Sequence, residues 1–240
     1  IADPSYFNVP VNYLLSEKYL KGRSQLIDKS VSTQNYKREN IINLAYEKLT
    51  IGKNYEKPST THISIIDSLG NAVSLTSSIE FAFGSGITTN GFFLNNQLTD
   101  FSFYNFNKKN EKIANSVEPG KKPRSSMAPT LVFQEDELIG VIGSPGGSRI
   151  ICYVSRVLYE ILFLKIDPVK AVASPHLCSR NKFSEIEKKL FSIKLKKSLE
   201  KIKHNIKIKE MTSGLNIIWK RNGLWLGIAD PRREGYAIGN

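Results

Sequence analysis

The chain has 240 residues, 40% of them hydrophobic and 23% charged, so it can bury one sizeable core or two small ones. Its 34 Lys and Arg outnumber 22 Asp and Glu, and the net charge of +12 would suit an anionic partner if it were concentrated on one surface. No apolar run approaches the roughly 20 residues that cross a bilayer, so we predict no membrane span. Cys152 and Cys178 lack the spacing of a zinc site or a disulfide framework, and we expect each to be a small buried apolar residue.

The first sixty residues alternate between extended, proline-marked pieces and helical patterns. Apolar residues recur at helical spacing over 14–27, where Ser16 is placed to cap the helix. A second short helix is predicted over 41–49, followed by a loop or linker that ends before Ser59. The start of the chain has neither an initiator methionine nor an export segment, which indicates a fragment or a processed product and leaves the compartment, periplasm or cytoplasm, open.

From Thr60 onward the pattern changes to short strands joined by turns. Residues 62–67 and 72–76 predict a hairpin that begins at Thr60 or Thr61, and 84–91 is predicted to be loop. Residues 130–133 and 138–143 predict a second hairpin.

The second half of the chain mixes helices and strands. We predict helices over 150–164, after Asp167, and in the Lys-rich segment 184–203, and strands over 206–212, 216–221 and 224–229. Strands, then helices, then strands again favour a layered α+β fold over a parallel βαβ repeat.

A run of hydroxyl residues, Ser59-Thr60-Thr61, separates the loop from the first strand. A hydroxyl is a poor nucleophile without a base beside it, but a threonine whose own α-amine is freed by cleavage of the preceding bond carries that base itself. Taken alone, such a cluster before a strand is usually structural.

Paired glycines, Gly146 and Gly147, precede the predicted helix 150–164. Glycines let a ligand approach the backbone, and free N–H groups at a helix start can hold an oxyanion or a carboxylate. A tight strand-to-helix turn would use the same residues.

Two further segments, 95–102 and 123–129, are dense in short polar side chains. Such a composition suits binding of a small zwitterion, with Asp on its ammonium and Ser on its carboxylate, although caps and turns need the same residue types.

Other motifs accompany these features in chain order. They are GNAVS (70–74), FGSG (83–86), LNNQ (94–97), DFS (100–102), PRSSMAPT (123–130), GSPGGSRI (143–150) and ADPRREG (229–235). Together with Thr60-Thr61-His62 they resemble the small subunit of the γ-glutamyltransferases, also called γ-glutamyl transpeptidases or glutathione hydrolases.

The resemblance implies an N-terminal-nucleophile (Ntn) hydrolase with an αββα sandwich, in which 1–59 is the tail of the large subunit and 60–240 the catalytic small subunit. Most of the large subunit would be missing, so the sandwich would be incomplete. The Ser59–Thr60 bond would be cut by the protein itself. Thr60 would then transfer the γ-glutamyl group of glutathione, or of a related compound, to water or to an amino acid or peptide, without cofactor or metal.

The resemblance also implies a role for each site residue. The Thr60 α-amine would be the general base, and Ser78 would hydrogen-bond the nucleophile. The remaining roles are oxyanion binding by Gly146 and Gly147, ammonium binding by Asp100 with Gln97, and carboxylate binding by Ser125 and Ser126.

There are two departures from the family pattern. Glu80 stands where many members have an asparagine that contacts the substrate amine, which leaves open a different acyl group, as in the cephalosporin and glutaryl acylases. The family's large subunit also supplies an arginine for the α-carboxylate, and neither Arg23 nor Arg38 matches it.

Several alternatives therefore stay open. A missing portion of the large subunit, a partner chain or a second copy could complete the fold, or the chain could be a non-catalytic remnant. The lysines of 188–197 could bind nucleic acid, but their alternation with Leu190, Ile193 and Leu195 favours the solvated face of an amphipathic helix, so we predict no nucleic-acid partner.

Overall fold

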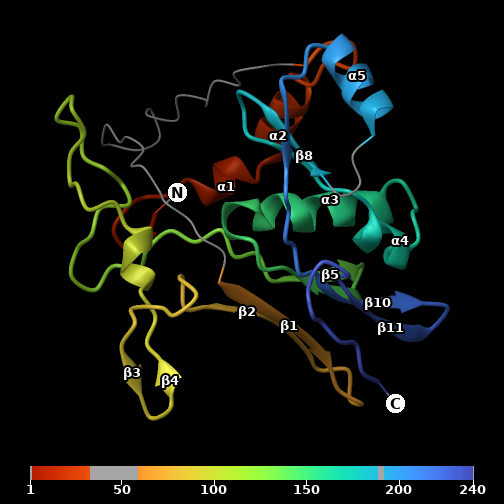
Figure 1. Ribbon diagram of the computed structural model, residues 1–240, viewed down its shortest axis with the longest axis horizontal. Coiled ribbons are helices and arrows are strands. Elements are labelled where there is room, and N and C mark those ends of the chain that lie inside the picture. The colour runs from red at the N-terminus through yellow and green to blue at the C-terminus, as the bar shows by residue number, and fades with distance from the viewer. Residues whose placement is uncertain (1, 33–58, 189–191, 240) are drawn as a thin grey trace.

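Two β layers and one helical layer make up most of the chain in the computed structural model, which describes residues 2–32, 59–188 and 192–239 (Figure 1). The central layer is an antiparallel four-stranded sheet with strand order β11-β10-β6-β5. Its strands are β5 (Thr130–Gln134), β6 (Glu137–Gly143), β10 (Asn216–Arg221) and β11 (Leu224–Ala229). Both hairpins of this sheet agree with the predictions from sequence.

The second β layer is the hairpin of β1 (Thr60–Ile66) and β2 (Ala72–Ser78), which packs on the four-stranded sheet. Asp67 closes its turn by accepting hydrogen bonds from the Leu69 and Asn71 amides at 2.9 and 2.8 Å. This turn fixes the register, which pairs Thr60 with Ser78.

The inner face of the hairpin is polar, and hydrogen bonds join it to the sheet. Ser64 Oγ donates to the Asn216 carbonyl at 3.0 Å, and Ser74 Oγ donates to the Ile142 carbonyl at 3.2 Å. The outer face is apolar and open in the described part of the chain, and its residues are Ile63, Ile65, Val73 and Leu75, each 47–51% exposed. The hairpin therefore has the reverse of the usual surface pattern, with its apolar side outward.

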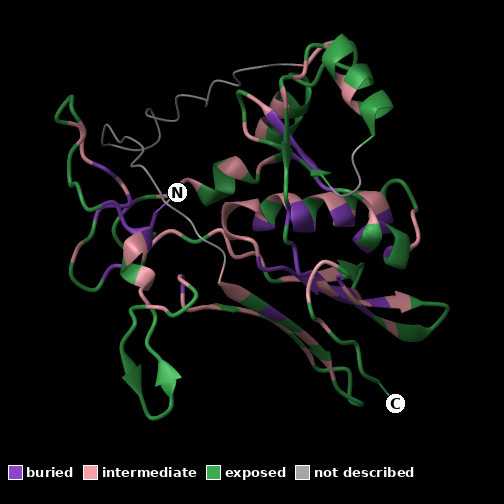
Figure 2. Cartoon of the chain, viewed as in Figure 1, coloured by how far each residue is buried: buried purple, intermediate pink, exposed green. Residues whose placement is uncertain are grey.

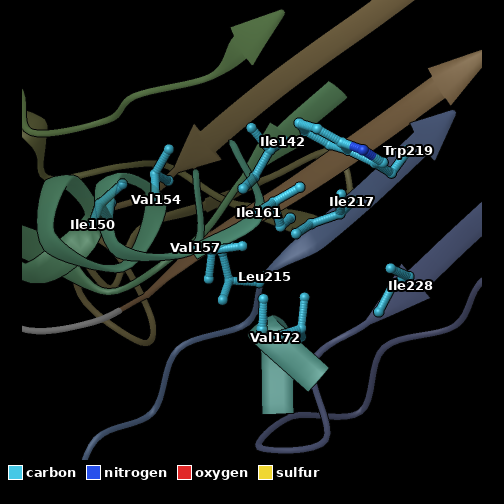
Figure 3. Packing of buried hydrophobic residues seen from close by; sticks show 11 residues of the cluster. Ile142, Ile150, Val154, Val157, Ile161, Val172, Leu215, Ile217, Trp219 and Ile228 are labelled. Carbon is cyan, nitrogen blue, oxygen red and sulfur yellow. The ribbon is translucent and has the colours of Figure 1, made fainter. Parts of the chain in front are cut away.

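Helices α3 (Ile150–Leu162) and α4 (Pro168–Ala173) pack on the other side of the sheet and close the main core (Figure 3). The apolar residues of α3 recur every three or four positions, so one stripe of the helix faces the strands. Asp167 caps α4 by accepting from the Val169 amide at 3.1 Å. The core includes Ile142, Val154, Val157, Leu215, Ile217 and Trp219.

A three-stranded sheet lies beside α3, and here one sequence prediction was wrong. Its strands are β7 (Leu177–Ser179), β8 (Ser184–Glu187) and β9 (Ile206–Lys209). The single helix predicted over 184–203 is instead β8 followed by the shorter helix α5 (Ile193–Lys201). The carboxylates of β8 are buried because distant arginines pair with them, Arg149 with Glu185 and Arg232 with Glu187. Local sequence carries no sign of such partners.

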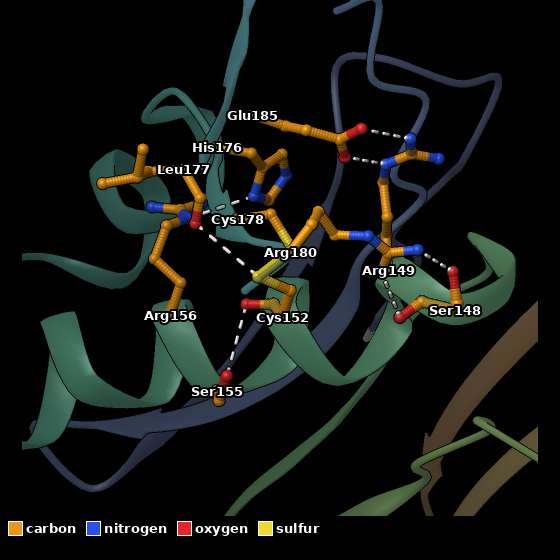
Figure 4. Close-up of a disulfide and its surroundings, with 10 residues drawn as sticks. All are labelled: Ser148, Arg149, Cys152, Ser155, Arg156, His176, Leu177, Cys178, Arg180 and Glu185. Carbon is orange, nitrogen blue, oxygen red and sulfur yellow. Dashed lines mark hydrogen bonds and ion pairs between the residues drawn. A yellow bond between two sulfur atoms is a disulfide. The ribbon is translucent and has the colours of Figure 1, made fainter. Parts of the chain in front are cut away.

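The cysteine prediction also needs correction. Cys152 in α3 and Cys178 in β7 form a disulfide, with Cα atoms 5.8 Å apart (Figure 4). They are 26 residues apart in sequence, and the fold brings β7 back over the start of α3. Cys178 is buried as predicted, whereas Cys152 is only half-buried.

Replacing Cys152 with serine is expected to lower the free energy of unfolding by about 3 kcal/mol, because a cross-link over a loop of this length restricts the unfolded chain. The measurement is thermal unfolding with and without a reducing agent. The reductant should lower the midpoint of the unsubstituted chain and leave that of the variant unchanged. Equal midpoints of both proteins under oxidising conditions would contradict the cross-link.

The remaining elements are short and lie at the periphery. Helix α2 (Glu17–Ser24) is shorter than the helix predicted over 14–27, and a separate short helix, α1 (Val11–Leu14), precedes it. Ser16 caps α2 as expected, accepting from the Tyr19 amide at 3.3 Å. The predicted loop 84–91 contains β3 (Thr88–Thr89), which pairs with β4 (Phe92–Phe93) in a fully exposed hairpin (Figure 2). The helix predicted over 41–49 lies outside the described residues. Within the described ranges, no helix combines the length and apolar character of a membrane span.

Candidate active site

A chain of hydroxyl groups lies at the open end of the β1–β2 hairpin. Because Thr60 and Ser78 are register partners, Thr60 Oγ1 donates to Ser78 Oγ at 3.2 Å. Ser78 Oγ in turn donates to the carbonyl oxygen of Ser59 at 3.3 Å and accepts from the Glu80 amide at 3.0 Å. The Thr60 hydroxyl is thus linked, through the Ser78 hydroxyl, to the Ser59 carbonyl that precedes it in the chain.

A narrow pocket surrounds these hydroxyls. Its volume is about 30 Å³, enough to hold water. The predicted site residues that line it are Thr60, Ser78, Glu80, Gln97, Asp100, Ser125, Ser126 and Gly147. The pocket is also lined by residues for which the sequence predicted no role: Arg124, Met127 and Ile150.

Two buried carboxyl groups form the acidic side of the pocket. Glu80 is 7% exposed and Asp100 is 8% exposed. Gln97 and Asp100 begin and end a 3₁₀ helix, and the Gln97 side-chain amide donates to the Asp100 carboxylate. Glu80 has a φ of 70°, a left-handed conformation that asparagine adopts more readily than glutamate. Glu80 thus lines the pocket as a buried residue in a strained backbone conformation.

Ser125 and Ser126 form the opposite side, on the irregular segment before β5. Ser125 Oγ accepts from the Met127 amide at 3.1 Å, a local turn that keeps its hydroxyl proton available for a ligand. The segment is anchored at Arg124, whose amide donates to Asn115 Oδ1 at 2.9 Å.

The glycine pair lies between β6 and α3. Gly146 and Gly147 have φ angles of 142° and 57°, which L-residues with side chains rarely adopt. Gly147 lines the pocket, and Gly146, just before it, packs under the Tyr153 ring. A Cβ at Gly146 would lie 2.6 Å from a Tyr153 ring carbon, so no larger residue fits there.

Side chains from the β7–β8 region hold the segment after the glycines (Figure 4). Arg180 donates to Ser148 Oγ at 2.7 Å, and Arg149 forms two hydrogen bonds to the Glu185 carboxylate at 2.7 and 3.0 Å. Burial raises the pKa of Glu185, but the hydrogen bond and charge of Arg149 outweigh it and the pKa is lowered. The Cys152–Cys178 disulfide lies one turn further along α3.

The two threonines of the Thr-Thr-His run differ in their surroundings. Thr60 lines both the narrow pocket and a second hollow of about 700 Å³, whereas Thr61 lines only the second. The second hollow is bounded by residues 230–235, from which Arg233 donates to the Thr60 carbonyl at 3.4 Å. Thr60 therefore lies where the two hollows meet, and Thr61 does not.

The family model of γ-glutamyltranspeptidase matches residues 1–240, which is the whole chain. The chain is a member of the γ-glutamyltranspeptidase family. The glutathione hydrolase proenzyme of Bacillus subtilis is 34% identical over 99% of this chain and 41% of its own length. The chain therefore spans about two fifths of that relative.

Solved structures of the family agree with this membership. A mutant of Helicobacter pylori γ-glutamyltranspeptidase is similar to 72% of this chain and 100% of its own, with 35% identity and a TM-score of 0.64. The cephalosporin acylase of Bacillus halodurans is similar to 98% of this chain and 42% of its own, with a TM-score of 0.76 but 21% identity, so that likeness concerns the fold alone.

Two buried histidines of this chain do not line the narrow pocket. His62 is 3% exposed, with Nδ1 lying 2.7 Å from Thr76 Oγ1, and burial lowers its pKa to about 4. Burial, followed by the charges of Arg156 and Arg232, lowers the pKa of His176 to about 2. Arg156 Nε donates to His176 Nδ1 at 3.1 Å, so this ring is neutral. In the described ranges, no three His, Cys, Asp or Glu side chains are grouped to hold a metal.

The lowered pKa values of these two histidines predict that the protein loses stability in acid. Their folded-state pKa values of about 4 and about 2 lie below the usual 6.5, so below pH 6.5 the unfolded state binds more protons. At pH 5 each would reduce the free energy of unfolding by up to about 2 kcal/mol. Urea unfolding at pH 7 and pH 5 measures this, and a His62→Gln variant should show a smaller difference. An unchanged free energy of unfolding at the two pH values would contradict it.

Proposed function

We propose that this chain carries the catalytic half of a self-processing γ-glutamyltransferase with Thr60 as nucleophile. The observation that carries the proposal is the hydroxyl chain from Thr60 through Ser78 to the Ser59 carbonyl, enclosed by the pocket of carboxyl, hydroxyl and glycine residues. The first reaction would act on the chain itself and the second on a γ-glutamyl compound.

In the self-cleavage step, Thr60 Oγ1 attacks the carbonyl carbon of Ser59. The Ser78 hydroxyl, which donates to that carbonyl oxygen at 3.3 Å, stabilises the negative charge that develops on it. Collapse breaks the Ser59–Thr60 amide and leaves an ester on Thr60 Oγ1, while the proton that Oγ1 lost passes to the Thr60 nitrogen. Water then hydrolyses the ester, which releases Ser59 as a carboxylate and frees the Thr60 hydroxyl beside its α-amine.

In the transfer step, the free α-amine accepts the proton of Thr60 Oγ1 as the oxygen attacks the γ-carbonyl of the donor. The amides of Gly146 and Gly147 hold the oxyanion, and this kind of donor is typically worth ~3 to 4 kcal/mol of barrier. The protonated amine then gives its proton to the leaving amine. Water, or the amine of an amino acid or peptide, next attacks the acyl-Thr60 ester, releases the γ-glutamyl product and restores the hydroxyl.

Recognition of the donor would use both sides of the pocket. Asp100 and Glu80 bind the α-ammonium by charge, and Ser125 and Ser126 donate hydrogen bonds to the α-carboxylate. The Gln97 side-chain amide already donates to the Asp100 carboxylate, and a carboxylate can accept an ammonium as well. Glutathione has both α-groups and a γ-amide, and it fits this chemistry.

The division of the chain at Thr60 belongs to the same proposal, with 1–59 as the large-subunit tail and 60–240 as the catalytic subunit. The open apolar face of the β1–β2 hairpin supports a further covering segment, because four half-exposed aliphatic side chains would otherwise face water. Further large-subunit sequence or a partner chain would add the outer layer of an αββα sandwich.

Intact-mass analysis tests the proposal on the chain expressed with any sequence that its gene places before Ile1. We expect two fragments, the second beginning at Thr60, together with release of aniline from a γ-glutamyl anilide. Only full-length protein and no release would reject the enzyme and favour a non-catalytic remnant.

A cephalosporin or glutaryl acylase is the second candidate, because Glu80 stands where many family members have an asparagine, although the charge of its carboxylate favours the γ-glutamyl donor. A carboxylate at this position would repel a donor that presents a second carboxyl group there, but it would bind an amine strongly. Comparing a glutaryl anilide with the γ-glutamyl anilide separates the two activities, since an acylase of this type would prefer the donor without an ammonium.

A further inference from the structure

Asn115 links the two sides of the pocket without lining it. Its side chain is buried, with 5% exposure of the residue. Nδ2 donates to the Asp100 carbonyl at 2.6 Å, and Oδ1 accepts from the Arg124 amide at 2.9 Å. One amide group thus bridges the residue proposed to bind ammonium and the segment proposed to bind carboxylate.

Backbone hydrogen bonds tie Asn115 to the Asp100 side. The Ser102 amide donates to the Asn115 carbonyl at 2.8 Å, and the Val117 amide donates to the Ser102 carbonyl at 3.3 Å. The Asn115 side chain also ties Arg124 to this unit. That side chain therefore joins the backbone of Asp100 directly to the residue before Ser125 and Ser126.

We propose that Asn115 is a positioning residue that sets the separation between the ammonium-binding and carboxylate-binding sides of the pocket, and so selects donors that carry both groups on one carbon. The inference rests on the proposed function. The two α-groups of a γ-glutamyl donor share a carbon atom, so their separation is fixed and both sides must be in register at once. A donor with only one of the groups can still bind to its own side of the pocket when the two sides have moved apart.

An amide suits this position because it offers a donor and an acceptor in one plane. Aspartate could still accept from the Arg124 amide, but as a carboxylate it would face the Asp100 carbonyl with no proton to donate. Asn115→Asp thus breaks one half of the bridge at nearly constant volume. Asn115→Ser removes both halves. Asn110→Asp is the matched control, since it makes the same change at an exposed position of the same segment.

Three anilide donors serve as probes: γ-glutamyl, with both α-groups; glutaryl, without the ammonium; and 4-aminobutyryl, without the carboxylate. We expect Asn115→Asp and Asn115→Ser to raise KM for the γ-glutamyl donor about 10- to 100-fold, with kcat within about 3-fold and self-cleavage retained. For the other two donors KM should change less than about 3-fold. Asn110→Asp should match the unsubstituted protein throughout.

Equal KM increases for all three donors, or none for the γ-glutamyl donor, would overturn the inference. Because KM does not depend on the amount of folded enzyme, the KM values of the three donors can still be compared if a variant is partly unfolded. Calorimetric binding of L-glutamate, glutarate and 4-aminobutyrate, none of which has an amide to cleave, to the unsubstituted protein and to Asn115→Asp separates this inference from the proposed function. If the unsubstituted protein shows no turnover but Asn115→Asp weakens its binding of glutamate, the enzyme is rejected and the positioning role is kept. Absence of glutamate binding would reject the positioning role.

Discussion

Replacing Thr60 with alanine is expected to abolish self-cleavage and to lower turnover at least about a thousandfold. The substitution removes the oxygen that attacks Ser59 and later the donor, and no other hydroxyl in the Thr60–Ser78–Ser59 arrangement has its own α-amine as a base. Intact mass after expression measures cleavage, and release of aniline from a γ-glutamyl anilide measures turnover.

Thr61→Ala and Thr60→Ser are the matched controls. Thr61 lines only the larger hollow, so its alanine variant should retain cleavage and part of the turnover. Serine keeps the hydroxyl and the adjacent amine, so Thr60→Ser should cleave more slowly but still cleave. Equal losses in Thr60→Ala and Thr61→Ala would mean that the wrong threonine has been assigned.

The Gly146→Ala variant is expected to lose about 10²- to 10³-fold in kcat, the typical cost of losing one oxyanion donor. The added Cβ would lie 2.6 Å from the Tyr153 ring, and alanine strongly disfavours a φ of 142°. The backbone must therefore move, and the Gly146 and Gly147 amides move with it. Steady-state kinetics with the γ-glutamyl anilide measures kcat.

Gly22→Ala is the control for a methyl group added to a glycine. A Cβ at Gly22, in helix α2, meets no atom within 4 Å, so this variant should have unchanged kcat and equal or slightly higher stability. If Gly146→Ala kept full kcat and a normal melting temperature, the glycine pair would have no role in oxyanion binding.

The elements best predicted from sequence are those whose signals are local. Alternating side chains around a tight turn predicted β10 and β11 with their observed bounds. The spacing of apolar residues every three or four positions predicted α3. The Asp167-Pro168 pair marked the start of α4 for an equally local reason, since the capping contacts lie within three residues.

Predictions failed where distant partners decide the outcome. Strand β8 was mistaken for part of a lysine-rich helix, because its buried glutamates are neutralised by Arg149 and Arg232 from other elements. The pairing of Cys152 with Cys178 depends on how β7 returns to α3, which no spacing rule contains. The bridging role of Asn115 was missed because its two hydrogen-bond partners lie 15 residues before it and 9 residues after it.

The sequence by itself determined the family of this protein, most of its helices and strands, and the residue types of the proposed site, because motifs and periodicity are properties of neighbouring residues. Only the tertiary structure decided that Thr60 faces Ser78, that carboxyl and serine residues line one pocket, and that an amide holds its two sides together. These are relations between segments far apart in the chain, and they follow from strand register and packing.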